Sequence, residues 1–137
     1  MKKRTYTRLL PIALVLLLTS AAAAQQESLP TLVKRVKPAV GAIATFDSSG
    51  EPVMTGSGFF LRPGQVVTNL HVIRNAVRAE IKTLDGKGKV FPVSGTLAVD
   101  EEGDLALLSV EMSPTERARS SELAKELPDE GEPTLVI

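Results

Sequence analysis

Residues 53–68 read VMTGSGFFLRPGQVVT, and this stretch decides the fold class. Val53–Leu61 is rich in β-branched and aromatic residues, and Arg62-Pro63-Gly64 follows it as a turn. Gln65–Thr68 then returns to β-forming residues. Two short β-rich runs joined by a tight turn predict an antiparallel hairpin.

The same pattern continues on both sides of this hairpin. Ser28–Lys37 is the exception and predicts a short helix, because its apolar residues recur at helical spacing and Pro38 ends it. The remaining strands are predicted by β-rich or alternating runs at 39–46, 79–84, 89–99 and 105–110, with turns at 47–50, 85–88 and 100–103. Six short strands with tight turns predict an all-β protein, an antiparallel barrel or sandwich.

The N-terminus has the layout of a secretory signal peptide. A basic start precedes the apolar run Leu9–Leu18, and Ala22 and Ala24 form an A-x-A arrangement. We therefore expect residues 1–24 to be a signal peptide and the protein to be exported, to the bacterial periplasm or beyond. The alternative is a membrane anchor, but ten apolar residues are fewer than the roughly 20 needed to span a bilayer. We expect no membrane anchor after cleavage.

Composition excludes several classes of function. The 137 residues carry no net charge, and without residues 1–24 there are 12 Lys and Arg against 16 Asp and Glu, about −4. A mildly acidic chain without long basic runs predicts no nucleic-acid partner. The absence of cysteine excludes disulfides and a thiol nucleophile, and a single histidine argues against a zinc site. No metal or organic cofactor is implied.

Three segments, in order, carry a resemblance to a known family. They are Gly56–Phe60 (GSGFF), Val67–Ile73 (VTNLHVI) and Gly103–Leu108 (GDLALL). Together they resemble the N-terminal half of a trypsin-like serine peptidase of the HtrA/Deg-like branch. The resemblance implies that the six-stranded antiparallel barrel is the first half of a double β-barrel. It divides the chain into a helical segment at 25–38, the first barrel at 39–112, and a connector with the start of a second barrel at 113–137.

By this resemblance, His71 is the general base and Asp104 is the carboxylate that orients it. A serine hydroxyl is a poor nucleophile until an imidazole accepts its proton, and a carboxylate on the other ring nitrogen fixes the required tautomer. Without the motif, a lone histidine is more often a residue with no chemistry, and Asp104 could belong to a solvated acidic turn. Asn69 is expected to cap or brace the turn that holds His71.

The nucleophile of the family is missing from this sequence. Its serine lies in a G-x-S-G-G segment after the aspartate, and no such segment is present. Ser57 has glycine on both sides, but it precedes His71 and lies in a predicted strand, so we reject it. We expect the chain to be truncated, inactive alone, and to expose an apolar patch and an unpaired strand at Pro133–Ile137.

The resemblance implies a serine endopeptidase that hydrolyses polypeptides, such as misfolded proteins, in the bacterial envelope. It also implies that oligomers can form. The alternative is a non-catalytic β-barrel that binds a peptide or partner chain, or a truncated relic of a protease.

Overall fold

The computed structural model describes residues 28–113, 120–134 and 136, and the predicted signal peptide lies outside them. The described part begins with the helix α2 (Leu29–Val36), followed directly by the single-turn helix η1 (Lys37–Ala39). Six strands follow, with the short helix α3 (Leu70–Ile73) between the third and fourth. The strands are β1 (Val40–Phe46), β2 (Pro52–Arg62), β3 (Gln65–Asn69), β4 (Arg78–Thr83), β5 (Val90–Asp100) and β6 (Leu105–Val110).

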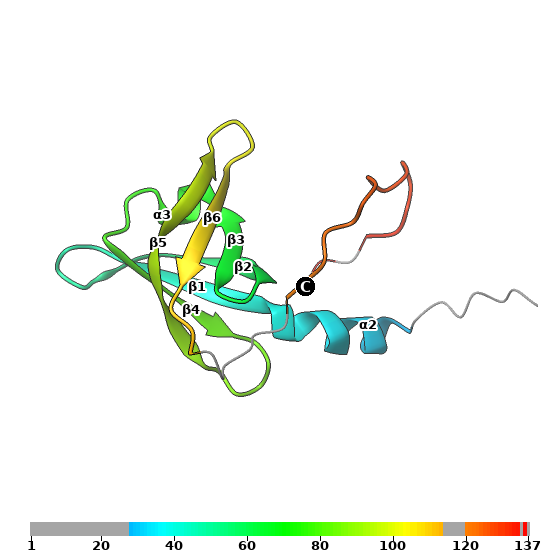
Figure 1. The fold of residues 1–137 in the computed structure, drawn as a ribbon, viewed down its shortest axis with the longest axis horizontal. Helices are drawn as coiled ribbons and strands as arrows, with labels where there is room; N and C mark the ends of the chain where they lie inside the picture. Colours follow the sequence, from blue (N-terminus) through cyan, green and yellow to red (C-terminus); the bar gives the residue numbers. More distant parts are fainter. Residues whose placement is uncertain (1–27, 114–119, 135, 137) are drawn as a thin grey trace, which may run out of the picture.

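These strands form one closed barrel in the order β1-β2-β3-β6-β5-β4 (Figure 1). Every neighbouring pair is antiparallel, and pairing of β1 with β4 closes the sheet on itself. The predicted six-stranded antiparallel barrel is confirmed, and the sandwich alternative is not formed. Closure satisfies the backbone groups that an open sheet would leave at its edges.

Alternation along each strand places the core inside the barrel. In β6, for example, the apolar run LALL splits, because Ala106 and Leu108 face inward while Leu105 is exposed. Phe60 is fully buried at the centre and is the largest of the completely enclosed side chains. The buried cluster consists of Ile43, Phe60, Val66, Leu70, Val72, Ile81, Phe91, Ala106, Leu108 and Val110.

The two glycines of the GSG segment leave space that neighbouring elements occupy. A Cβ on Gly58 would lie 2.8 Å from the Val67 carbonyl oxygen, which is backbone and cannot rotate away. A Cβ on Gly56 would lie 2.6 Å from a methyl group of Val72, which belongs to α3. Gly58 therefore allows β2 and β3 to pack closely, and Gly56 allows α3 to settle against β2.

The segment after β6 contains no helix or strand within residues 120–134. It is attached to the barrel by the Ser121 backbone N–H, which donates to the Phe60 carbonyl at 2.8 Å. Pro133, Thr134 and Val136, described parts of the strand expected at 133–137, are not in a strand. In the parts of the chain that the structure describes, no helix is long and apolar enough to cross a bilayer.

Candidate active site

The pairing of β3 with β6 brings His71 and Asp104 together, although they are 33 residues apart. Asn69, the last residue of β3, lies opposite Leu105, the first residue of β6. Leu70, which follows Asn69, and Asp104, which precedes Leu105, must then lie close together. The Leu70 backbone N–H donates to the Asp104 carbonyl at 3.0 Å.

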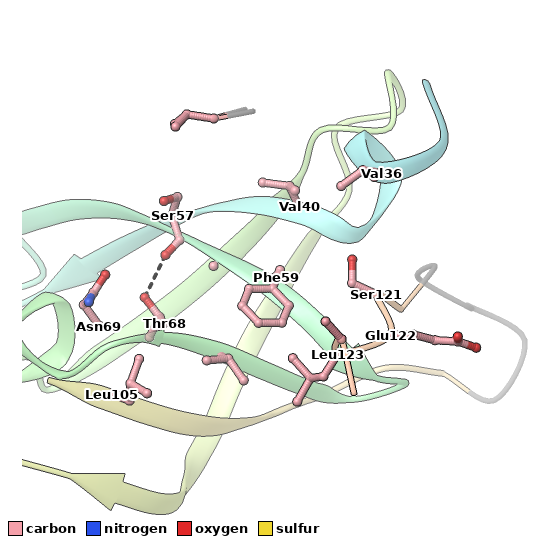
Figure 2. A pocket seen from close by; sticks show the side chains of 14 residues that line it. Val36, Val40, Ser57, Phe59, Thr68, Asn69, Leu105, Ser121, Glu122 and Leu123 are labelled. Carbon is pink, nitrogen blue, oxygen red and sulfur yellow. Dashed lines mark hydrogen bonds between the residues drawn. The ribbon is translucent and has the colours of Figure 1, made fainter. Parts of the chain in front are cut away.

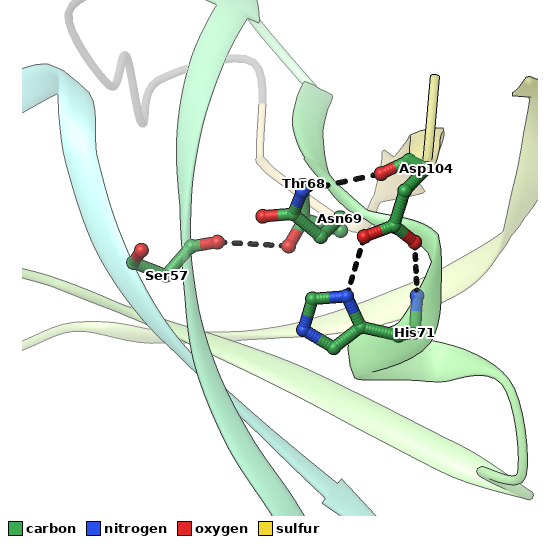
Figure 3. Close-up of polar contacts among 5 residues, drawn as sticks. All are labelled: Ser57, Thr68, Asn69, His71 and Asp104. Atoms are coloured by element: carbon green, nitrogen blue, oxygen red, sulfur yellow. Dashed lines mark hydrogen bonds and ion pairs between the residues drawn. The ribbon is translucent and has the colours of Figure 1, made fainter. Parts of the chain in front are cut away.

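The Asp104 carboxylate contacts His71 at two points (Figure 3). One oxygen, Oδ1, accepts the His71 backbone N–H at 2.9 Å, and the other, Oδ2, lies 2.5 Å from the ring nitrogen Nδ1. The first bond satisfies an N–H at the start of α3 that has no partner within the helix. Asp104 thus caps α3 from a distant part of the sequence, and that cap fixes the carboxylate against the imidazole.

This contact determines which ring nitrogen is free. An ionised carboxylate only accepts hydrogen bonds, so Nδ1 must carry the proton of the neutral ring. Nε2 then keeps its lone pair and faces away from Asp104 (Figure 3). A histidine held in this form can accept a proton at Nε2, as a general base must.

The pKa of Asp104 lies below its ordinary value of 3.8. The largest cause is the hydrogen bond with the His71 ring, followed by the bond from the His71 backbone N–H. Both side chains remain open to solvent, with 59% of the His71 side chain and 42% of the Asp104 side chain exposed. Solvent therefore screens the charge interaction between them.

Acid should destabilise the barrel partly through Asp104. Because its folded pKa lies below the unfolded value, the stability it contributes is fully present above pH 3.8 and is lost as the pH falls through the folded pKa. We expect Tm, measured by circular dichroism from pH 6 to pH 2, to fall less steeply below pH 4 for Asp104→Asn than for the native chain. Glu101→Gln, in the same loop, should keep the native slope, and equal slopes for all three would contradict this assignment.

Ser57 is not placed as a nucleophile for this pair. Its carbonyl accepts the Thr68 hydroxyl at 2.8 Å, which ties β2 to β3 next to the site. Its own hydroxyl points away from the His71 ring (Figure 3). Ser57 lies in β2, as the sequence predicted when it was rejected as the nucleophile.

An open groove begins beside the pair and runs along the outside of the barrel (Figure 2). It has a volume of about 550 Å³. Asn69 and Leu105 line one end, and residues 121–124 and Val36 of α2 line the other. Its floor is an apolar row on paired strand positions, Val40, Phe59 and Val67, which continues to Leu107.

Within the described residues, no three His, Asp or Glu side chains gather in an arrangement that could hold a metal ion. Asp100 stabilises the turn before Asp104, because its carboxylate accepts the Gly103 backbone N–H at 3.0 Å.

Comparison with known proteins identifies the family to which the barrel belongs. A family model described as a trypsin-like peptidase domain matches residues 56–137, more than half of the chain. The chain belongs to the trypsin-like peptidase family. The matched region of this trypsin-like peptidase domain includes α3, which carries His71, and β6, which begins directly after Asp104.

A curated relative of this trypsin-like domain is named for a different role. The anti-sigma-I factor RsgI9 of Acetivibrio thermocellus is 36% identical over 66 residues. The match covers 48% of this chain and 9% of that protein. The chain thus spans less than a tenth of the length of this relative.

Three features of the site could not be read from the motifs. The sequence predicted a turn around His71, whereas the structure forms the helix α3 and caps it with Asp104. Asn69 donates to the Asp104 carbonyl at 3.2 Å, a contact between segments far apart in sequence. Gly56 makes room for α3, and the only signal for this was a small residue inside a predicted strand.

Proposed function

We propose that this protein is a serine endopeptidase of the HtrA/Deg type, in which His71 is the general base and Asp104 orients it. The two-point contact between Asp104 and His71 carries the proposal. One bond fixes the main chain of α3 and the other fixes the ring, so Nε2 is held ready to accept a proton.

In this mechanism Nε2 of His71 removes the proton from a serine hydroxyl as that oxygen attacks the peptide carbonyl. The proton then passes from Nε2 to the leaving amine, and the Asp104 charge stabilises the imidazolium between these steps. The serine and the amide groups that bind the oxyanion are supplied, in this proposal, by a segment that these 137 residues do not include.

The groove is an argument that a second barrel packs on this one in the complete peptidase. Its apolar row, formed by Val40, Phe59, Val67 and Leu107, extends across four strands on the outer surface. Covering this row would remove apolar area from water and would also shield the exposed His71 and Asp104. Exclusion of water strengthens the electrostatic interaction on which the pair depends.

The proposed substrates are polypeptides of the bacterial envelope, with misfolded chains as the first class to test. Support for this location comes from the signal-peptide layout of residues 1–24, with its basic start and its A-x-A arrangement. The residues after Ala24 have an acidic balance, as noted above, which gives no basis for a nucleic-acid substrate.

A second candidate is a regulatory binding module that has kept the barrel without the reaction. The name of the anti-sigma-I factor RsgI9 favours this candidate, because it describes a protein that acts on a sigma factor. The matched part is a small fraction of that protein. In this reading the open groove would hold a peptide or a partner chain.

Labelling with a fluorophosphonate probe separates the two candidates. We expect no labelling of the 137-residue chain, because it contains no G-x-S-G-G segment and the Ser57 hydroxyl points away from the His71 ring (Figure 3). The protein encoded by the whole gene should be labelled at one serine and should cleave unfolded casein, and His71→Ala should abolish both activities.

Two outcomes would contradict the peptidase proposal. Whole-gene protein that neither reacts with the probe nor cleaves casein would favour the binding module. Labelling of the 137-residue chain at Ser57 would show that the nucleophile has been assigned to the wrong part of the protein.

A further inference from the structure

We propose that Asn69 is a positioning residue for the His71–Asp104 pair, acting through the Asp104 main chain. Its side-chain amide donates from Nδ2 to the Asp104 carbonyl at 3.2 Å. The interaction does not involve the ring of His71, so Asn69 would act on the base only by way of Asp104 (Figure 3).

The position of Asn69 in the chain makes this contact informative. It is the N-cap residue of α3, where an asparagine side chain normally accepts a backbone N–H of the first helical turn. Here the Asn69 side chain makes no capping bond, and Asp104 accepts the His71 N–H instead. The two residues have exchanged roles: Asp104 caps the helix, and Asn69 holds Asp104.

Asp104 requires such a restraint. It is the one non-glycine residue with positive φ in the described part of the chain, at 51°. This left-handed conformation is sterically unfavourable for a residue with a Cβ, although aspartate tolerates it better than most. A residue held there persists only where its surroundings fix it.

Two donors converge on the Asp104 carbonyl and supply that restraint. One is the Leu70 backbone N–H at 3.0 Å, and the other is the Asn69 amide. A carbonyl oxygen has two lone pairs and can accept both bonds. Together they set the peptide plane after Asp104, and this orients the carboxylate toward His71.

The Asp104 carboxyl group also responds to Asn69. The Asn69 amide is among the smaller causes that lower the pKa of Asp104, after the two bonds from His71. Loss of the amide should therefore raise the pKa of Asp104 directly. The pKa of Asp104 should rise further if the two bonds from His71 lengthen once the Asp104 main chain is released.

The experiment uses the full 137-residue chain and follows its only histidine by NMR. We expect Asn69→Ala to raise the pKa of the Asp104 carboxyl, measured from its ¹³C shift, and to lower the ratio of Nδ1–H to Nε2–H tautomers several-fold in the ¹⁵N spectrum. Hydrogen exchange of the His71 amide should accelerate in parallel. Asn69→Leu, which keeps a similar size without a donor or a charge, should give the same changes.

Asn75→Ala is the matched control, because Asn75 is the other asparagine of the chain and lies exposed just after α3. It should leave the carboxyl pKa, the tautomer ratio and the amide exchange at their native values. Native values in both Asn69 variants would overturn the proposal. So would a variant that unfolds, because Asn69 would then support the fold rather than the pair.

The catalytic meaning of this inference rests on the proposed function, but its test does not. The NMR signals report the geometry of the pair without turnover and without a serine nucleophile. A native tautomer ratio in the Asn69 variants would remove the positioning role and leave the peptidase proposal intact. Failure of the whole-gene protein to cleave casein would remove the peptidase proposal and leave the positioning role of Asn69 intact.

Discussion

Replacing Asp104 with Asn is expected to lower kcat for peptide hydrolysis by the whole-gene protein by about 10⁴-fold. The two-point contact explains the size of this effect. The His71 backbone N–H must still find an oxygen, so the amide oxygen of the new residue takes the Oδ1 position. The amide nitrogen is then turned toward Nδ1 and can only donate to it.

That donation imposes the wrong tautomer on His71. Nδ1 becomes the acceptor, the proton moves to Nε2, and the nitrogen that should take the serine proton has no free lone pair. Size and hydrogen-bond count are nearly preserved, so the barrel should remain folded. Steady-state kinetics with a peptide substrate, together with circular dichroism, measures both consequences.

Glu101→Gln is the matched control for this variant. It removes one carboxylate from the same acidic loop, on an exposed residue close to Asp104. Its kcat should stay within about twofold of the native value, because Glu101 is not among the groups that bond to Asp104 or His71. A similar loss in the two variants would mean that the negative charge of the loop matters and that the orientation of His71 does not.

Phe60→Ala is expected to destabilise the barrel by about 3–5 kcal/mol. Phe60 is completely buried in the core cluster, to which all six strands contribute side chains. Its removal leaves a cavity that a closed six-stranded sheet cannot collapse to fill. Since domains of this size have roughly 5–15 kcal/mol of stability, much of the total would be lost.

Phe59→Ala provides a control one residue away. Phe59 faces the opposite side of β2, where it lines the open groove and remains partly exposed. Its loss should cost less than about 2 kcal/mol in the 137-residue chain, because less apolar area returns to water. Urea denaturation of both variants gives the two free energies of unfolding. Equal losses would contradict the placement of Phe60 in the core and Phe59 on the outer surface.

Much of the fold could be predicted from local patterns. Five of the six predicted strands lie within one residue of the observed bounds at each end, and the sixth, at 105–110, coincides with β6. Alternation and turn residues are properties of neighbouring positions, so they can be read without knowledge of the partner strand. The helix α3 was missed because four residues are too few to show a helical period.

The candidate site was predicted differently. His71 and Asp104 were selected by motif, and nothing in their local sequence states that they touch. Asn69 was expected to cap or brace its own turn, whereas it makes no capping bond and its amide reaches the carbonyl of Asp104. A side chain that serves a distant backbone group leaves no periodic signal in the sequence.

The sequence by itself determined the strands, the turns between them and the identity of the one histidine. Only the tertiary structure decided that β1 pairs with β4 to close the barrel, and that the register of β3 on β6 sets Asn69 opposite Leu105. The physical reason is that strand formation depends on nearby residues, whereas register depends on packing of the whole interior. The left-handed backbone of Asp104 and its bonds to His71 follow from that register.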